Sequence, residues 1–300
     1  MNKLILRIAV LALLAAPAAA QVWEASAGAD AAAQIARVRS AVKSAPSRPA
    51  AAPLPSGSAH QPAALKALLD LVGRTARAGK TPVVMFDLDD TLIDTGYRQM
   101  AIIKEYAAQA DVRARFPGAA DKMGAIRYGD LHYDIGDTLK ALGVAETGAI
   151  LPELTAFWAA RFFDNGYLQL DHANPGGVDY VREVLRRGGK AVYLTGRWEA
   201  MRPGTAQSMA RMGYPPADGQ NVILMMKPDR AQSDIDFKKV AFGDIAGLGQ
   251  VVGGFENEPA NVNAYQERFQ TGIYIFLDTR HSTTAAVPLP SIFWIGDFRY

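Results

Sequence analysis

The chain has 300 residues, with 32 Lys and Arg side chains against 30 Asp and Glu, so its formal net charge at pH 7 is only +2. This length can bury a large core, and a charge so evenly balanced, without a local Lys/Arg cluster, argues against nucleic acid as a partner. The chain contains no cysteine, which excludes disulfides, thiol catalysis and cysteine-based zinc sites.

The first 20 residues predict a cleavable export signal. A short basic start containing Lys3 and Arg7 is followed by an apolar run that ends in small residues at Ala20. The apolar run is too short to span a bilayer comfortably, so we expect cleavage after Ala20 and no stable membrane anchor afterwards. The mature protein is expected to be periplasmic or secreted. Residues 21–61 are rich in Ala and Pro and are expected to form a flexible N-terminal segment.

From residue 62 onward, helix-like and strand-like stretches alternate, which predicts an α/β domain with a parallel sheet. Residues 96–171 are mostly helical by pattern and rich in aromatic side chains, as expected of a small helical bundle, a lid over a site, or both. The last residues, 292–300, predict a compact aromatic tail that docks on the core. We expect helices over residues 62–79, 97–110, 137–142 and 147–163, and strands over residues 83–86, 191–194, 221–226, 250–255 and 272–277.

Three carboxylates follow the first predicted strand within four residues: Asp87, Asp89 and Asp90. Carboxylates this close repel one another and raise each other's pKa unless positive charge lies between them. A hard divalent cation such as Mg²⁺, which prefers carboxylate oxygens, would offset the charge. The alternative is a solvated acidic turn that caps a helix. The apolar strand before the cluster and Thr91-Leu92 after it favour a catalytic site.

A second strand end carries residues suited to a phosphoryl group. The strand expected at 191–194 is followed by Thr195, Gly196 and Arg197. Thr195 can donate its hydroxyl to a phosphoryl oxygen, and Gly196 allows the backbone N–H to approach closely. Arg197 either contacts the substrate or braces the loop. Because the carboxyl ends of parallel strands meet at the edge where such sheets bind ligands, this loop is expected near the acidic cluster.

The stretch Phe-Asp-Leu-Asp-Asp-Thr-Leu over residues 86–92 resembles the first motif of the haloacid dehalogenase-like hydrolases. The resemblance extends from about residue 82 to residue 279, with four motifs in the expected order. It implies a Rossmann-like parallel sheet flanked by helices, formed by residues 62–95 and 172–300. Residues 96–171 would then be a C1 cap, a mostly helical lid that excludes water and selects substrate.

The resemblance also implies roles for individual side chains. Asp87 would be the nucleophile, and Asp89 would protonate the leaving alcohol and later deprotonate water. Thr195 and the loop at Gly196 would bind the phosphate. The third motif needs a lysine that offsets the clustered negative charge and binds the transferring phosphoryl group.

Two lysines qualify for the third motif. Lys238 lies at the start of a helix, and Lys227 lies at the end of a strand and is followed by a proline. We favour Lys238 because its helix leads to the fourth motif, and we keep Lys227 as the alternative.

The fourth motif should complete a magnesium site. Glu256 and Asn257 occupy its position, but Asn257 stands where the family usually has the Asp that ligates the metal. The resemblance therefore implies Mg²⁺ held by Asp87, the backbone carbonyl of Asp89, and Glu256 or Asn257. Glu258 is a further possible source of the carboxylate.

Together these features predict an exported, Mg²⁺-dependent phosphatase that hydrolyses small phosphomonoesters through an aspartyl-phosphate. Family members that cleave carbon–halogen bonds lack the second Asp, which is present here as Asp89. Two alternatives remain: a phosphotransferase or phosphomutase of the same family, and a non-catalytic envelope binding protein that retains the fold.

Overall fold

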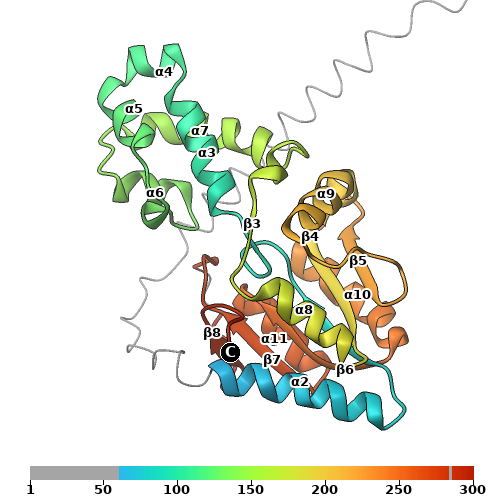
Figure 1. The fold of residues 1–300 in the computed structure, drawn as a ribbon. Helices are drawn as coiled ribbons and strands as arrows, with labels where there is room; N and C mark the ends of the chain where they lie inside the picture. The colour runs from blue at the N-terminus through green and yellow to red at the C-terminus, as the bar shows by residue number, and fades with distance from the viewer. Residues whose placement is uncertain (1–60, 284–285) are drawn as a thin grey trace, which may run out of the picture. The chain divides into compact units, whose positions relative to one another are not determined.

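The computed structural model describes residues 61–283 and 286–300 (Figure 1). The expected export signal and the expected flexible segment lie outside the described residues, except Gln61, which begins a helix. Within the described part of the chain, no helix is both long and apolar enough to cross a bilayer.

A six-stranded sheet forms the centre of the fold, in the order β5-β4-β1-β6-β7-β8. All neighbouring strands run parallel, as the alternating pattern predicted. The predicted α/β fold is thereby confirmed. The strands are β1 (Pro82–Phe86), β4 (Lys190–Trp198), β5 (Val222–Lys227), β6 (Gln250–Glu256), β7 (Ile273–Leu277) and β8 (Phe293–Ile295).

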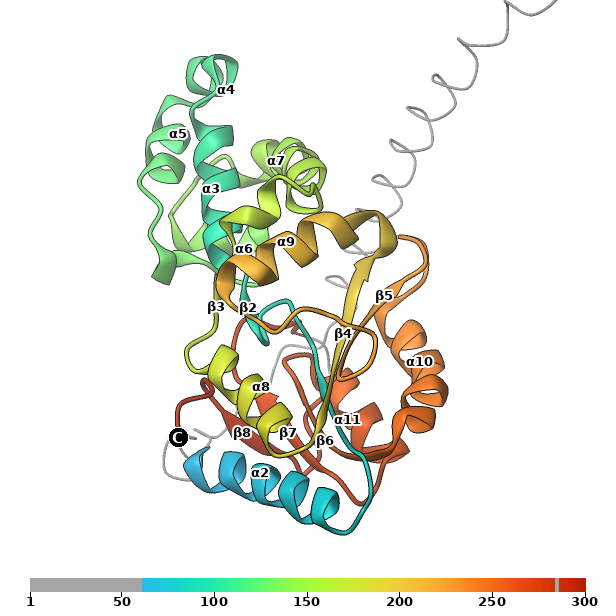
Figure 2. The same cartoon turned by 45° about the vertical axis from the view of Figure 1, so that its right-hand side comes forward.

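Helices cover both faces of this sheet (Figures 1 and 2). Val84 and Phe86 of β1 pack into one apolar cluster with α2, α8 and α9, whereas Val83 and Met85 pack into a second with α10 and α11. Successive residues of a strand point to opposite faces, so a strand buried on both sides must be apolar throughout. The helices are α2 (Gln61–Arg77), α8 (Gly177–Arg186), α9 (Arg202–Met212), α10 (Asp234–Leu248) and α11 (Pro259–Arg268).

Between β1 and β4 the chain forms a helical insertion with an apolar cluster of its own. Two short antiparallel strands, β2 (Ile93–Asp94) and β3 (His172–Ala173), pair where the chain enters and leaves it. This agrees with the helical pattern of the sequence, while its role as a cap stays a prediction. The insertion contains α3 (Gly96–Ala107), α4 (Ala110–Arg115), α5 (Pro117–Gly124), α6 (Ile135–Ala141) and α7 (Thr147–Phe162), with single turns η1 (Tyr128–Asp130) and η2 (Tyr167–Leu170).

Two strands differ from the expectation. β4 does not end at residue 194 but continues to Trp198, and its pairing with β5 is irregular after Thr195. A 3₁₀ turn, η3 (Glu199–Met201), then leads into α9. The aromatic tail contributes β8, whose backbone extends the sheet beyond β7. Strand β8 was missed because three residues carry too little periodicity to predict a strand.

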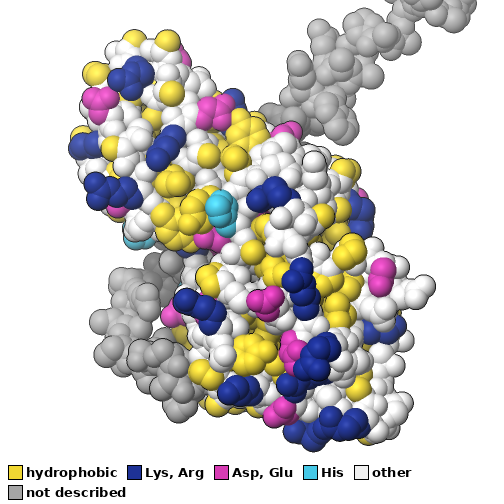
Figure 3. All heavy atoms as spheres, in the orientation of Figure 1, with side chains coloured by type: hydrophobic (Ala, Val, Ile, Leu, Met, Phe, Trp, Pro, Cys, Tyr) yellow, Lys and Arg dark blue, Asp and Glu magenta, His cyan; other side chains and the backbone are white. Residues whose placement is uncertain are grey.

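The surface over α2 and α8 carries many basic side chains with acidic ones among them (Figure 3). Arg187 of the α8 end illustrates the pairing, since it contacts both Asp70 and Glu183. Asp70 is exposed and the other two side chains are partly exposed, and surface pairs of this kind each contribute only about 0–1 kcal/mol to stability.

Candidate active site

Asp87 and Lys238 form a buried ion pair at the carboxyl end of β1. Lys238 reaches Asp87 from α10, with 2.7 Å between Nζ and Oδ1. The same ammonium lies 2.6 Å from Oε2 of Glu256, the last residue of β6. Tyr265 donates its hydroxyl to that glutamate oxygen at 3.0 Å. One cation therefore serves two buried carboxylates, which leaves one negative charge at the end of the sheet.

This excess of negative charge affects the pKa values of Asp87 and Lys238. Burial, and next the Glu256 carboxylate, raise the pKa of Asp87 well above its ordinary value, against the opposing effect of Lys238. Burial disfavours the ammonium, but Asp87 and Glu256 outweigh it and raise the pKa of Lys238. Lys238 is therefore a permanent cation, and Asp87 would gain from further positive charge nearby.

Asp89, two residues further along the turn, is held by two arginines. Arg197 donates Nε to Oδ2 at 2.9 Å and Nη2 to Oδ1 at 2.7 Å. Arg98 adds a bond from Nη2 to Oδ1 at 3.0 Å. Asp171 balances the second arginine, with 2.9 Å to Arg197 Nη2 and 2.9 Å to Arg98 Nε. Two guanidinium groups and two carboxylates thus form a neutral cluster.

The arginines hold Asp89 in its ionised form. Burial alone would raise the pKa of Asp89, but Arg197 and then Arg98 lower it to about 2. In this arrangement Asp89 is ionised at neutral pH and a weak base, because both of its oxygens accept bonds from arginine. To donate a proton to a leaving group, it must first separate from the arginines and become protonated.

Thr195 and Gly196 lie within β4, the neighbour of β1 in the sheet, and not in a loop after it. Thr195 is fully buried. At Gly196, an added Cβ would lie only 2.1 Å from Oδ2 of Asp234. Only glycine allows Asp234 to pack against the backbone here, so the sequence signal at Gly196 has a steric reason in this chain.

The two candidate lysines have different partners in the structure. Lys238 contacts Asp87, whereas Lys227 donates to Asp234 Oδ1 at 2.7 Å and to the Gln232 carbonyl at 2.9 Å. Lys227 therefore fastens the loop after β5. This placement favours Lys238 as the lysine that acts on the phosphoryl group, a role that stays a prediction.

The fourth-motif side chains point to different partners. Glu256 Oε2 is bound by Lys238 and Tyr265, and its Oε1 accepts the N–H of Glu258 at 3.2 Å. Asn257 accepts a weak bond from Thr91 Oγ1 at 3.3 Å. Both oxygens of Glu256 are engaged within the protein, so the side-chain oxygen of Asn257 is the better placed of the two for a metal.

A set of oxygens in this region fits a hard cation. Among the described residues, no donor bonds to Oδ2 of Asp87 or to the backbone carbonyl of Asp89, and Asn257 Oδ1 has only its long bond to Thr91. The other carbonyls of the turn, those of Asp87, Leu88, Asp90, Thr91 and Leu92, each accept a hydrogen bond.

Carboxylate, amide and backbone oxygens together suit Mg²⁺, which combines a few protein ligands with water. Side-chain acids alone do not make the site: residues 61–283 and 286–300 contain no group of three or more His, Cys, Asp or Glu arranged to hold a metal.

Three residues of this region were missed by the sequence reasoning: Arg98, Asp171 and Arg280. Arg98 belongs to the first turn of α3, and Asp171 directly precedes β3. Arg280, in the loop after β7, contacts Asp90 Oδ1 at 2.8 Å. None belongs to a recognisable local motif. The only available signal was the position of Arg280 just after a predicted strand, at the edge where the other motifs meet.

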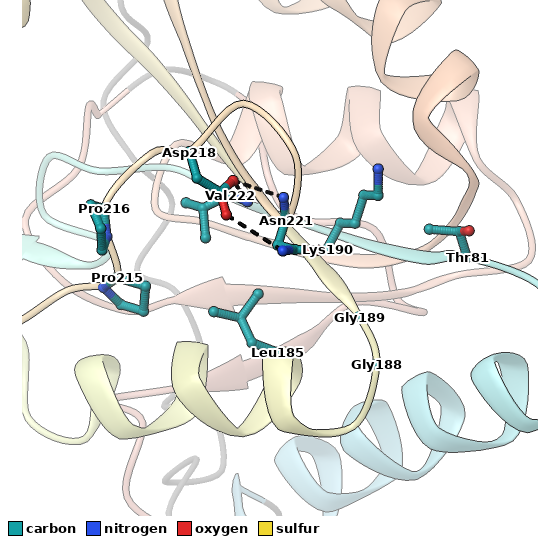
Figure 4. A pocket seen from close by; sticks show the side chains of 10 residues that line it. All are labelled: Thr81, Leu185, Gly188, Gly189, Lys190, Pro215, Pro216, Asp218, Asn221 and Val222. Atoms are coloured by element: carbon teal, nitrogen blue, oxygen red, sulfur yellow. Dashed lines mark hydrogen bonds between the residues drawn. The ribbon is translucent and has the colours of Figure 1, made fainter.

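A separate cavity of about 560 Å³ opens at the other end of the sheet (Figure 4). Lys190 and Val222, at the starts of β4 and β5, line it together with Asp218, which bonds to Asn221. No predicted site residue lies there.

No family model and no curated protein matches the sequence. Solved structures similar to the chain include a β-phosphoglucomutase from Pyrococcus sp. strain ST 04, with 15% identity and a TM-score of 0.42 over 73% of this chain and 93% of that one. A second is described as a predicted phosphoglycolate phosphatase from Haemophilus somnus, with 11% identity and a TM-score of 0.44 over 73% of this chain and 95% of that one.

A third similar structure is a haloacid dehalogenase superfamily hydrolase, subfamily IA, from Geobacter sulfurreducens. It has 11% identity and a TM-score of 0.40 over 73% of this chain and 93% of that one. At these identities and scores the likenesses do not assign a function, and the assignment of chemistry depends on the site itself.

Proposed function

We propose that this protein is a Mg²⁺-dependent phosphatase that hydrolyses small phosphomonoesters through an aspartyl-phosphate on Asp87. The observation that carries the proposal is the buried Asp87–Lys238 pair, in which one carboxylate oxygen is fixed by the ammonium and the other has no donor among the described residues. A carboxylate held at one oxygen and open at the other is arranged as a nucleophile.

The chain's own residues account for the two steps. In the first, Oδ2 of Asp87 forms a bond to phosphorus while the bond from phosphorus to the ester oxygen breaks, and the alcohol leaves with a proton. In the second, water attacks the aspartyl-phosphate, loses a proton, and releases phosphate and free Asp87. Lys238 and Thr195 would neutralise or donate to the phosphoryl oxygens during both displacements.

For the second step, Asp89 would have to free an oxygen from Arg98 and Arg197 before it could take the proton from water, because a carboxylate with a pKa of about 2 is a weak base. For the first step, Asp89 would have to leave Arg98 and Arg197, take up a proton and then deliver it to the alcohol. Bound Mg²⁺ would supply positive charge that offsets the charge on the phosphoryl oxygens. The Asp89 carbonyl, Asn257 Oδ1 and the Asp87 carboxylate, through the oxygen that does not attack phosphorus, would hold it.

The test is release of inorganic phosphate from a panel of phosphomonoesters, measured with Mg²⁺ and with EDTA. We expect release with Mg²⁺, none with EDTA, and at least about a thousandfold loss in Asp87→Asn. Asp278→Asn is the matched control, since Asp278 also follows a strand at this edge, but its side chain is exposed and its one ion pair among the described residues is with His281, at 3.9 Å. Full activity in Asp87→Asn would refute the nucleophile.

Product analysis separates hydrolysis from transfer. A phosphatase releases phosphate at a rate that added alcohols do not diminish, whereas a phosphotransferase or phosphomutase moves the phosphoryl group to an acceptor. The polar, partly exposed carboxylate of Asp89, with 35% of its side chain accessible, favours a site that water can enter.

We also propose that the protein acts outside the cytoplasm, on the strength of the predicted signal over residues 1–20. Mass spectrometry of the protein recovered from the periplasm or the medium should give a chain that begins at Gln21. A chain retained in the cytoplasm with residues 1–20 attached would refute export.

A further inference from the structure

The loop after β7, residues 278–282, bonds to both halves of the candidate site. Thr279 donates its hydroxyl to the Asp90 carbonyl at 2.5 Å, on the turn that carries the nucleophile. Ser282 donates its N–H to Glu258 at 3.0 Å and its hydroxyl to the same carboxylate. This loop, which we call the brace loop, therefore connects the first and fourth motifs through bonds that no local sequence pattern reveals.

The backbone of the brace loop also fixes the amide of Asn257. The carbonyl of Arg280 accepts a bond from Asn257 Nδ2 at 2.7 Å, and Thr91 Oγ1 donates to Asn257 Oδ1 at 3.3 Å. A donor on one side and an acceptor on the other permit only one orientation of the amide. A carboxylate in this place would set an oxygen against the Arg280 carbonyl at hydrogen-bond distance, with no proton between them.

We propose that Asn257 is required as an amide, and that the Arg280 carbonyl is what positions its oxygen toward the site. Asn257, in place of the family's aspartate, then matches the Arg280 carbonyl of this chain, and the substitution does not weaken the site. The inference adds detail to the magnesium site of the proposed function. It rests on that function only for the identity of the cation that Asn257 Oδ1 would bind.

The Arg280 side chain holds the brace loop in place. Its Nη2 lies 2.8 Å from Asp90 Oδ1 and 2.5 Å from Asp94 Oδ1, and its Nη1 lies 2.8 Å from the hydroxyl of Tyr128 in the helical insertion. A Cβ on Gly96 would come within 2.8 Å of this guanidinium. Arg280 is thus a positioning residue that connects the insertion, through its own carbonyl, to Asn257.

The test compares Asn257→Asp and Asn257→Ala with the same changes at Asn263. Asn263 is a matched control because its Nδ2 also donates to a backbone carbonyl, that of Val287 at 2.9 Å, and its Oδ1 accepts the N–H of Leu289. The melting temperature of the full chain is measured in EDTA and then with Mg²⁺ alone as the probe.

In EDTA we expect each Asn257 variant to melt at least about 3 °C below its Asn263 counterpart, because the partly buried Arg280 carbonyl loses its donor whereas the bond of Asn263 is exposed. Asn257→Ala adds no charge, so its fall in melting temperature reports the missing hydrogen bond without the repulsion among carboxylates that Asn257→Asp introduces. With Mg²⁺ we expect a smaller rise in melting temperature for Asn257→Asp than for the unmodified chain.

Two results would overturn the inference: equal losses at the two positions in EDTA, or a larger Mg²⁺ response in Asn257→Asp than in the unmodified chain. If the unmodified chain shows no Mg²⁺ response, the proposed metal site is refuted. The requirement for the amide is still decided in EDTA by the Asn257→Asp and Asn263→Asp comparison, with the two Ala variants as the charge-free reference.

Discussion

Replacing Lys238 by Met tests the centre of the site. The substitution keeps a long apolar side chain of similar length and removes only the ammonium that Asp87 and Glu256 share. The same change at Lys227 provides the comparison, since Lys227 is also buried but its partner Asp234 is not.

The expected magnitudes follow from the exposure of the partners. The carboxylates beside Lys238 are nearly inaccessible, with 7% and 1% of their side chains exposed, for Asp87 and Glu256 respectively. Removing one partner of a buried ion pair costs about 3–5 kcal/mol, because the remaining charge cannot be solvated. Asp234 is 57% exposed, so water replaces Lys227, and the cost falls to about 1 kcal/mol.

The assay is equilibrium unfolding by urea in EDTA, from pH 5 to pH 8. Without Lys238, which opposes the effect of burial, the folded-state pKa of Asp87 rises further above its unfolded value. The folded chain then binds more protons than the unfolded chain, so the variant loses stability as pH rises toward that pKa and regains it as pH falls. We expect the deficit of Lys238→Met to be largest at pH 8 and smaller at pH 5.

The activity of the two variants gives a second comparison. Lys238→Met should lower kcat more than Lys227→Met does, since only Lys238 contacts Asp87. Three results would contradict this placement of charge. They are equal stability losses for the two variants, a stability deficit of Lys238→Met that grows toward pH 5, and a greater loss of kcat in Lys227→Met.

Three further predictions concern the surroundings of the site. In Arg98→Gln, the pKa of Asp89 should rise by about one unit from its value of about 2, moving the acid limb of kcat/KM to higher pH; an unmoved limb would contradict the pairing. Tyr128→Phe removes a hydroxyl that donates to Asp94 at 2.6 Å and accepts from Arg280. The substitution should lower the free energy of unfolding in urea by about 1 kcal/mol and should raise KM more than it lowers kcat. A change confined to kcat would argue against a role for Tyr128 in holding the insertion. Gly196→Ala should lose about 1 kcal/mol of stability, because the exposed Asp234 side chain can move aside only by leaving Lys227. The same change should cost less in an Asp234→Ala background, and an equal cost there would place the clash elsewhere.

The sequence indicated the parts of the site that depend on local order along the chain. The alternation of helices and strands predicted the parallel sheet, because both faces of its strands must be apolar. The acids at the end of β1 and the Thr195-Gly196 segment of β4 then meet at one edge, because all the strands run the same way.

Only the tertiary structure decided which partners those residues have. Asp89 is bound by Arg98 and Arg197, so that its pKa falls to about 2, and Asn257 is fixed by the Arg280 carbonyl. These partners come from separate segments, and a hydrogen bond depends on atoms within about 3 Å and not on separation along the chain.

The sequence therefore indicates which acidic residues belong to the site, and the packing of the fold determines their electrostatics. Residues 86–92 by themselves carry the three acids, but nothing in that stretch reveals that Asp87 shares a lysine with Glu256 or that Asp89 is held ionised. The physical reason is that a pKa and a side-chain orientation depend on every charge and dipole nearby, and the fold brings these together from distant parts of the chain.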